Sequence, residues 1–277
     1  MLFDSHAHIN NDTYTQEERE ALIKEIEASD LSYVMDIGFD IKSSRKAAEH
    51  SNKLPWCYGA VGVHPHDAKT MNEEIFNEIE KLAGNEKIKA IGEIGLDFHY
   101  DRSERDVQEY WFRRQIQLAN KLRMPIVIHS RDADQKTMDI LKEEGAFSEE
   151  RKSWFPERQG AEPEKKEKDA RVLLHCFSGS KELGKEYVKL GATLSVAGPV
   201  TYKNNHKTVQ MVEAIPIEYL LVETDSPYLT PVPFRGKQNK PVYVEHTARR
   251  VALIKNLSYE EVAMRTMENA KVFFGIK

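Results

Sequence analysis

Eight short apolar segments, each followed by a longer charged stretch, constrain the fold of this chain more than any other feature. The apolar segments are typical of buried strands, and the amphipathic stretches between them are typical of surface helices. In order, the segments read MLFDSH, SYVMDIG, WCYGAVGVHP, IKAIGEIGL, PIVIHS, RVLLHCF, ATLSVAG and YLLVETD. Eight such units are the number that closes a (β/α)8 barrel, and an open doubly wound sheet is the alternative that periodicity leaves open.

Polar residues at the ends of these segments favour the barrel. A His, Glu or Asp ends one predicted strand after another, and barrel enzymes build their active sites from the carboxyl ends of several strands. The length of 277 residues is usual for a single barrel of this kind. We therefore expect an α/β protein whose residues 1–277 form one domain, a (β/α)8 TIM barrel.

One segment interrupts the alternation between the fifth predicted helix and the sixth predicted strand. Residues 147–171 read FSEERKSWFPERQGAEPEKKEKDAR, which is crowded with charge and broken by proline and glycine. We expect an inserted excursion or a mobile loop that contributes nothing to the core and is held to the body by Trp154 and Phe155. Helix-to-strand connections lie on the face of a barrel opposite the active site, so we expect no catalytic role for this insert.

Charge and cysteine content exclude several classes of protein. The net charge of −5 argues against a generally basic surface that coats nucleic acid, although a local positive pocket is compatible with it. The two cysteines, Cys57 and Cys176, do not indicate a disulfide framework, and we expect Cys176 to pack in the core. No signal-like or membrane-spanning apolar run is present, so we expect a cytoplasmic protein without membrane contact. Because no heptad pattern or long apolar patch predicts a dimer, we expect a monomer.

The first segment places two histidines two residues apart, and positions i and i+2 of a strand share a face. Imidazole is the commonest metal ligand in proteins, so His6 and His8 are candidates for joint ligation. Further donors end the predicted strands in GVHPH, GEIGLD, VIHSRDA, LLHCFSG and VETDSPYL, and they are His64, Glu93, His129, His175 and Asp225. Packing does not explain so many polar groups, because each costs about 1–3 kcal/mol when buried without a partner. A converging ring of metal ligands explains them all.

Together these motifs resemble the TatD-related deoxyribonucleases, a family of metal-dependent hydrolases with TIM barrels. The resemblance runs through DSHAHIN, VGVHPHDA, AIGEIGLDFHYD, PIVIHSRDA, LLHCFSG and LLVETDSPYLTP to RGKQNKP, over nearly the whole chain except the insert. It implies two divalent metal ions, with the ligands His6, His8 and Asp225 for one, His129 and His175 for the other, and Glu93 as the bridge. The nitrogen-rich ligand set suits zinc or manganese, whereas family members are described as magnesium-dependent, so Zn, Mn and Mg all remain open.

The resemblance implies hydrolysis of DNA at single-stranded or frayed ends, because a pair of metal ions can activate water and neutralise a phosphate. We expect Asp225 and Glu93 to be catalytic, with Asp225 as the general base, and His64 to contact the phosphate or leaving group. Basic and polar groups near the site are the other candidates for substrate binding: Arg131, Arg235, Lys237 and Asn239. Two alternatives stay open. One is an amidohydrolase or esterase that acts on a small anionic metabolite or an aminoacylated nucleic acid. The other is a barrel that only binds metal or a partner.

Overall fold

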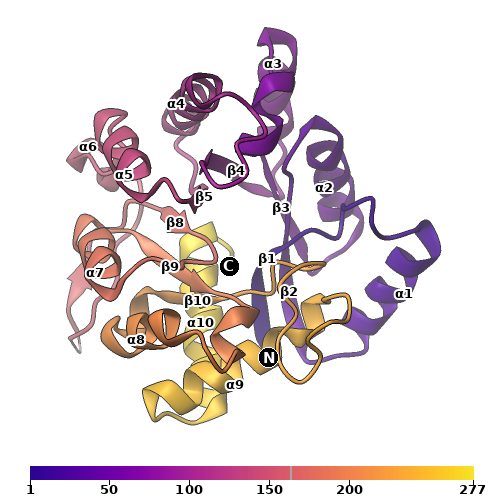
Figure 1. Cartoon of the computed structure of the whole chain (residues 1–277), viewed down its shortest axis with the longest axis vertical. Helices are drawn as coiled ribbons and strands as arrows, with labels where there is room; N and C mark the ends of the chain where they lie inside the picture. Colours follow the sequence, from indigo (N-terminus) through magenta and orange to yellow (C-terminus); the bar gives the residue numbers. More distant parts are fainter. Residues whose placement is uncertain (163) are drawn as a thin grey trace.

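Eight parallel strands form one sheet in the computed structural model, which describes residues 1–162 and 164–277. Each of the eight predicted strands is present, and Figure 1 shows the helices arranged around them. The strands are β1 Leu2–Ala7, β2 Leu31–Ile37, β3 Cys57–Val61, β4 Ile88–Asp97, β5 Ile126–Arg131, β8 Val172–Leu174, β9 Thr193–Val196 and β10 Leu220–Val222.

Helices connect consecutive strands and form the outer layer. They are α1 Gln16–Glu27, α2 Ile41–Lys53, α3 Glu73–Ala83, α4 Arg105–Leu122, α5 Asp134–Glu143, α7 Lys181–Leu190, α8 His206–Ala214, α9 Val244–Lys255 and α10 Tyr259–Phe274. Short 3-10 turns are η1 Pro65–Thr70, η2 Gly198–Thr201, η3 Ile217–Tyr219 and η4 Pro241–Tyr243. Helix α1 begins with a capping box, in which Thr15 and Glu18 each accept a hydrogen bond from the other's backbone N–H.

The sheet closes on itself where β1 meets the end of β10. A single parallel bridge pairs Ala7 with Ser226. Backbone hydrogen bonds extend this contact, because the N–H of Asp225 donates to the carbonyl of His6 and that of His8 donates to the carbonyl of Ser226, both at 2.8 Å. The strands therefore form a nearly closed (β/α)8 barrel, as predicted, and the first and last strands lie side by side.

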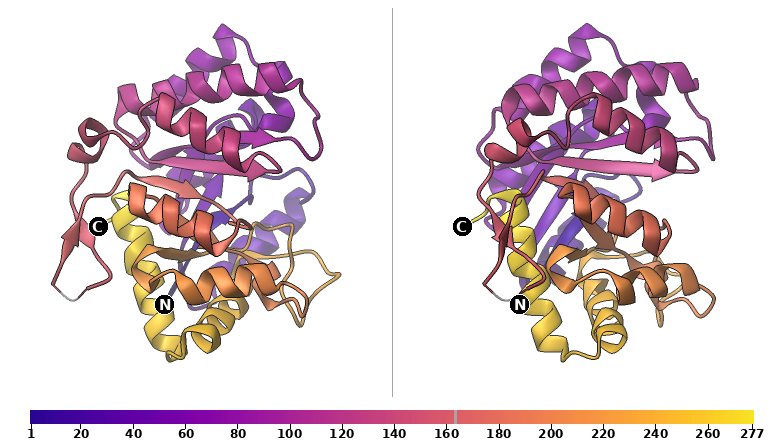
Figure 2. Two further views of the ribbon diagram at one scale, coloured as in Figure 1. Left: turned by 60° about the vertical axis from the view of Figure 1, so that its left-hand side comes forward. Right: turned by 90° about the vertical axis from the view of Figure 1, so that its left-hand side faces the viewer.

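Two apolar clusters stabilise the barrel. The larger lies between the strands and the outer helices. The smaller includes Phe3, Met35, Val127 and Leu221 from the strands and continues into Phe273 of α10. In Figure 1, α10 (yellow) lies behind the strands, and Figure 2 shows it from the side. Helix α10 thus packs against the amino-terminal end of the barrel, and the polar strand ends gather at the other end.

The two ends of the charged insert pack against the barrel, so the expectation that it contributes nothing to the core is wrong, although most of the described residues from 156 to 168 are exposed. It contains α6 Glu149–Ser153 and a two-stranded hairpin of β6 Arg158–Gln159 and β7 Lys166–Glu167, while its Pro163 lies outside the described residues. Trp154 and Phe155 are only half-buried. The most buried charged side chains, each at most 6% exposed, are Arg151, Arg158, Asp169 and Arg171.

Backbone carbonyls explain how such a polar segment becomes buried. Arg151 donates to the carbonyls of Met124 and Ala170, and Arg171 donates to those of Val272 and Phe273 at the end of α10. A guanidinium group has five N–H donors, and a cation at the C-terminus of a helix is stabilised by the helix dipole. The insert therefore joins the amino-terminal end of the barrel to its last helix.

We expect Arg171→Met to lower the free energy of unfolding by about 3 kcal/mol, because it leaves the buried Asp169 without its closest cation. Urea denaturation followed by circular dichroism measures this loss. The matched control is Lys165→Met in the same insert, where an exposed side chain is expected to contribute less than about 0.5 kcal/mol. Equal stability of the two variants would contradict the role given to Arg171.

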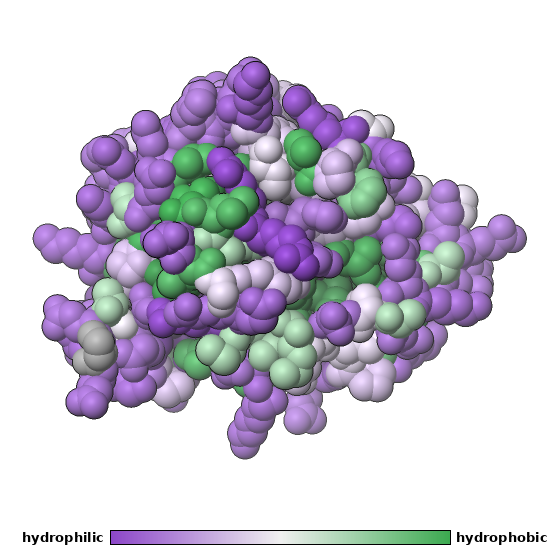
Figure 3. Space-filling model, turned by 90° about the horizontal axis from the view of Figure 1, so that it is seen from below, coloured by the Kyte–Doolittle hydropathy of each residue, from purple (hydrophilic) through white to green (hydrophobic). Residues whose placement is uncertain are grey.

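The outer surface is mostly hydrophilic. Seen from below, hydrophilic side chains surround smaller hydrophobic patches (Figure 3). The exposed apolar side chains include Leu253 on α9 and Met264 on α10, and scattered residues of this kind are normal on a protein surface. Among the described residues, no helix is both long enough and apolar enough to cross a membrane.

Candidate metal centre

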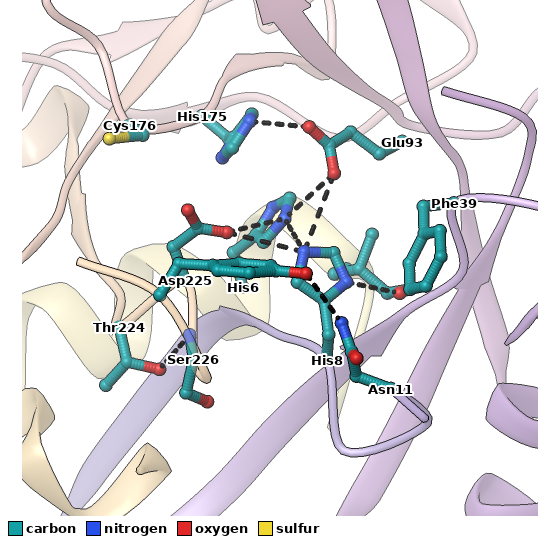
Figure 4. Close-up of polar contacts among 12 residues, drawn as sticks. His6, His8, Asn11, Phe39, Glu93, His175, Cys176, Thr224, Asp225 and Ser226 are labelled. Atoms are coloured by element: carbon teal, nitrogen blue, oxygen red, sulfur yellow. Dashed lines mark hydrogen bonds and ion pairs between the residues drawn. The ribbon is translucent and has the colours of Figure 1, made fainter. Parts of the chain in front are cut away.

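Histidine and carboxylate side chains from separate strands meet at the carboxyl ends of the barrel strands. Some belong to β1, β4 and β5, and the others lie one to three residues after β1, β8 and β10. Figure 4 shows several of them pointing toward one another. The structure brings together all six predicted ligands: His6, His8, Glu93, His129, His175 and Asp225.

Glu93 lies at the middle of this cluster and is 3% exposed. Its Oε2 atom lies 3.4 Å from Nε2 of His6 and 3.6 Å from Nε2 of His8. Its Oε1 atom lies 2.8 Å from Nε2 of His175 and 3.0 Å from Nδ1 of His129. One oxygen of this buried carboxylate therefore faces the histidines of the first strand and the other faces His129 and His175, while the rings of His6 and His175 stack 3.9 Å apart.

Asp225 completes the group formed by the two histidines of the first strand. Its Oδ1 atom lies 3.3 Å from Nε2 of His8 and 3.8 Å from Nε2 of His6. The backbone pairing between β1 and the end of β10 places these residues side by side. The closure of the barrel thus builds this half of the site.

The donor atoms fit divalent cations. Nε2 of His6 lies 3.3 Å from Nε2 of His8, and Nε2 of His175 lies 3.4 Å from Nδ1 of His129, so nitrogen atoms converge beside buried carboxylates. Nδ1 of His8 donates a hydrogen bond to the carbonyl of Ile37 at 2.7 Å, so Nε2 is the nitrogen that can bind a metal in place of its proton. In each of three sets of residues, the donor atoms lie within 4.8 Å of one another. The sets are His6, His8 and Glu93; His6, His175 and Glu223; and His64, Glu93 and His129.

The electrostatics of the cluster keep its carboxylates ionised. Burial opposes the charged form of Glu93, but the charge on His175 and the hydrogen bonds with His129 and His175 outweigh it and hold the pKa of Glu93 well below its usual value. Burial likewise opposes the charge on Asp225, and its hydrogen bond with His8 lowers its pKa nevertheless. For His8, burial is outweighed by Asp225 and Glu93, which raise its pKa to about 9. Without a metal the carboxylates are therefore ionised and paired with protonated imidazoles, and a cation would take the place of the imidazole protons.

Asp97, at the end of β4, supports the histidine of β5 and was missed by the sequence analysis. Its Oδ2 atom lies 3.1 Å from Nε2 of His129 and 2.8 Å from Nε2 of His66. Because Nε2 of His129 faces Asp97, its Nδ1 faces Glu93. The GEIGLD motif contained this aspartate, but its partner is 32 residues away in the sequence.

Glu223, two residues before Asp225, supports His175 in the same way as Asp97 supports His129. Its Oε1 atom lies 3.4 Å from Nδ1 of His175, and its Oε2 atom accepts a hydrogen bond from the hydroxyl of Ser195. Carboxylates that bind the second nitrogen of a metal-binding histidine fix the orientation of the ring. Glu223 was present in the VETD motif, but its role was not predicted.

We expect Asp97→Asn to weaken metal binding by about 10–100-fold, because the change removes the charge that orients His129. Isothermal titration of metal-free protein with Mn²⁺ or Zn²⁺ measures this loss. Asp132→Asn is the matched control, since Asp132 is exposed and pairs with His99 outside the cluster. Affinities within twofold of wild type for Asp97→Asn would show that Asp97 has no such role.

The predicted substrate-binding residues lie at two depths. His64 is buried within the cluster, with its Nε2 atom 3.5 Å from Oε1 of Glu93. Arg131 is exposed at the end of β5, and Arg235 and Lys237 are exposed in the loop between β10 and η4. The guanidinium group of Arg235 lies 4.4 Å from the centre of the Tyr202 ring.

Two predictions differ from the structure. Asn239 is fully buried, and its side-chain amide donates to the carbonyls of Thr224 and Tyr228, so it holds the loop together and does not face a substrate. Cys176 is half-buried beside His175 and not packed in the core. Strand β8 ends at Leu174, so Cys176 lies beyond the strand, where side chains no longer alternate between its two faces.

Sequence comparison assigns the chain to a protein family. A family model described as TatD related DNase matches residues 3–275. A Bacillus subtilis protein named "Uncharacterized metal-dependent hydrolase YabD" is 42% identical over 276 residues, which cover 100% of both chains. A Mycobacterium tuberculosis protein named "Uncharacterized metal-dependent hydrolase TatD" is 31% identical over 287 residues, which cover 99% of this chain and 98% of the relative.

Solved structures share the fold. The Escherichia coli TatD homologue YjjV superimposes with a TM-score of 0.85 at 22% identity, over 100% of this chain and 98% of the other. A TatD family hydrolase from Entamoeba histolytica gives a TM-score of 0.81 at 21% identity, with the same coverage. The match to the family model over nearly the whole chain, together with these relatives, shows that the chain belongs to the TatD-related DNase family of metal-dependent hydrolases.

Proposed function

We propose that the protein hydrolyses phosphodiester bonds in DNA and removes nucleotides from single-stranded or frayed ends. The observation that carries this proposal is the position of Glu93, whose two oxygens face two separate groups of histidines. A bridging carboxylate between two sets of ligands is suited to a pair of divalent ions. When bound, such ions would supply an activated water and neutralise the charge on the phosphate.

Each ligand has a place in this scheme. The residues that would hold one ion are His6, His8 and Asp225, those for the other are His129 and His175, and Glu93 would contact both. Asp225 is the more accessible carboxylate, because its side chain is 14% exposed and that of Glu93 is 4% exposed. Asp225 can therefore accept a proton from the attacking water, which is the role of a general base.

His64 is placed to bind the substrate. Its Nδ1 atom accepts a hydrogen bond from the backbone N–H of His66 at 3.1 Å, and burial holds its pKa well below the usual value. The neutral ring therefore carries its proton on Nε2, which faces the centre. This N–H can donate to a phosphate oxygen or to the leaving oxygen.

Positive side chains near the strand ends favour an anionic substrate. Arg131, Arg235 and Lys237 are exposed on a chain whose net charge is −5. Guanidinium groups pair with phosphate through two parallel hydrogen bonds, and a lysine supplies a point charge. We assign these three residues to binding of the DNA backbone.

Hydrolysis of end-labelled single-stranded DNA tests the proposal. Metal-stripped protein is supplied separately with Mg²⁺, Mn²⁺ or Zn²⁺, and Glu93→Ala runs alongside to reveal contaminating nuclease. Release of nucleotides that requires a metal and is lost in the variant is the expected result. If no ion supports DNA cleavage while the loaded protein hydrolyses ester or amide substrates, the alternative of an amidohydrolase or esterase replaces this proposal.

A further inference from the structure

An exposed tyrosine on the connection between β4 and α4 lies close to the metal centre and has no part in the scheme above. Tyr100 is 49% exposed. The centre of its ring lies 5.4 Å from that of His66, which pairs with Asp97, the carboxylate that orients His129. Tyr100 therefore offers an aromatic surface beyond the metal ligands, on the side of β4 and β5.

Two guanidinium groups lie over this ring and leave part of its surface open to solvent. That of Arg131 lies 4.6 Å from the ring centre and that of Arg102 lies 5.4 Å from it. Within residues 1–162 and 164–277, neither arginine forms an ion pair with a carboxylate, and the neighbouring Asp132 is paired with His99 at 2.9 Å. Both positive charges are therefore available to an anion.

A groove of about 620 Å³ continues from Arg102 along the start of α4. Asp101 and Arg105, which line it, pair with each other at 2.6 Å, so their charges cancel. The remaining charged groups of the lining are Lys69, Arg102 and Glu104, which leave an excess of positive charge. The groove is large enough for a group the size of a nucleotide.

We propose that Tyr100, Arg102 and Arg131 form a subsite for the nucleotide next to the one that is released. The exposed ring surface of Tyr100 stacks on its base, the two arginines bind its phosphates, and the strand continues into the groove at α4. Every base has a π face, so this subsite accepts any sequence and favours single strands, whose bases are free to stack on protein. The inference rests on the proposed nuclease function and names how that site would hold its substrate.

Two substrates of different length distinguish a loss of binding at the subsite from a loss of function at the metal centre. The p-nitrophenyl ester of thymidine 5′-monophosphate has one nucleotide, whereas single-stranded oligothymidylate also reaches Tyr100. For Tyr100→Ala we expect the loss of kcat/KM on the oligonucleotide to exceed the loss on the ester by about tenfold, through a higher KM. Tyr100→Phe keeps the ring and is expected to restore the KM. Arg102→Glu is expected to raise the KM for the oligonucleotide and to weaken its dependence on salt.

Tyr110→Ala and Lys189→Glu are the matched controls. Tyr110 is 50% exposed farther along α4, and Lys189 is exposed near the carboxyl end of α7, so both are expected to retain the wild-type KM. An unchanged KM for the oligonucleotide in Tyr100→Ala, or an equal loss on both substrates, would overturn the subsite alone. A wild-type protein that hydrolyses neither substrate with any ion would overturn the proposed function and the subsite with it.

Discussion

Glu93→Gln is expected to lower metal-dependent hydrolysis by at least about 1,000-fold while the barrel stays folded. The amide has the same size as the carboxylate, but it lacks the negative charge and turns an NH2 group toward one of the two histidine groups. Because changes to residues that only support ligands already weaken metal binding by about 10–100-fold, we expect the loss of the shared ligand to exceed that range. Elemental analysis after gel filtration measures the bound metal, and DNA hydrolysis measures turnover.

The matched control for this variant is Glu86→Gln, which removes an exposed carboxylate shortly before β4 and leaves the centre intact. It is expected to retain wild-type metal content and turnover. If Glu93→Gln kept both its metal and its activity within tenfold of this control, Glu93 would not be the bridge between the two groups of ligands.

Asp225→Asn is expected to lower kcat by about 10²–10⁴-fold at saturating metal, which is the usual contribution of a general base. An amide cannot accept the proton of the attacking water at neutral pH, and the loss of the negative charge also weakens the interaction that raises the pKa of His8. Steady-state kinetics at increasing metal concentration separate weaker metal binding from slower chemistry. Recovery of wild-type kcat at high metal would show that Asp225 is a ligand only.

The sequence predicted the barrel and the candidate donors because both follow from local patterns, and the resemblance to the family selected the six ligands among these donors. Each strand is a short apolar run, and each donor comes at the end of such a run, where parallel strands in a barrel present their side chains to one site. The spacing of His6 and His8 is an example, since their Nε2 atoms meet at 3.3 Å. No contact between distant segments had to be known for these predictions.

The features that the sequence did not reveal depend on contacts between distant residues. Asp97 has a role only because His129 and His66 lie on either side of its carboxylate. Arg171 is buried because carbonyls at the end of α10, about 100 residues later in the chain, accept its hydrogen bonds. Charged residues are seldom fully buried unless they are paired, so composition alone predicted an exposed insert.

A titration of metal-free protein with Mn²⁺, in which bound metal and hydrolysis of single-stranded DNA are measured together, tests the central claim most directly. If one carboxylate joins two metal positions, the chain binds two equivalents, and nucleotide release reaches its maximum only when the second is bound. Full activity with one equivalent would contradict a paired site. Two bound equivalents without DNA cleavage would leave the metal centre in place and contradict the proposed nuclease function.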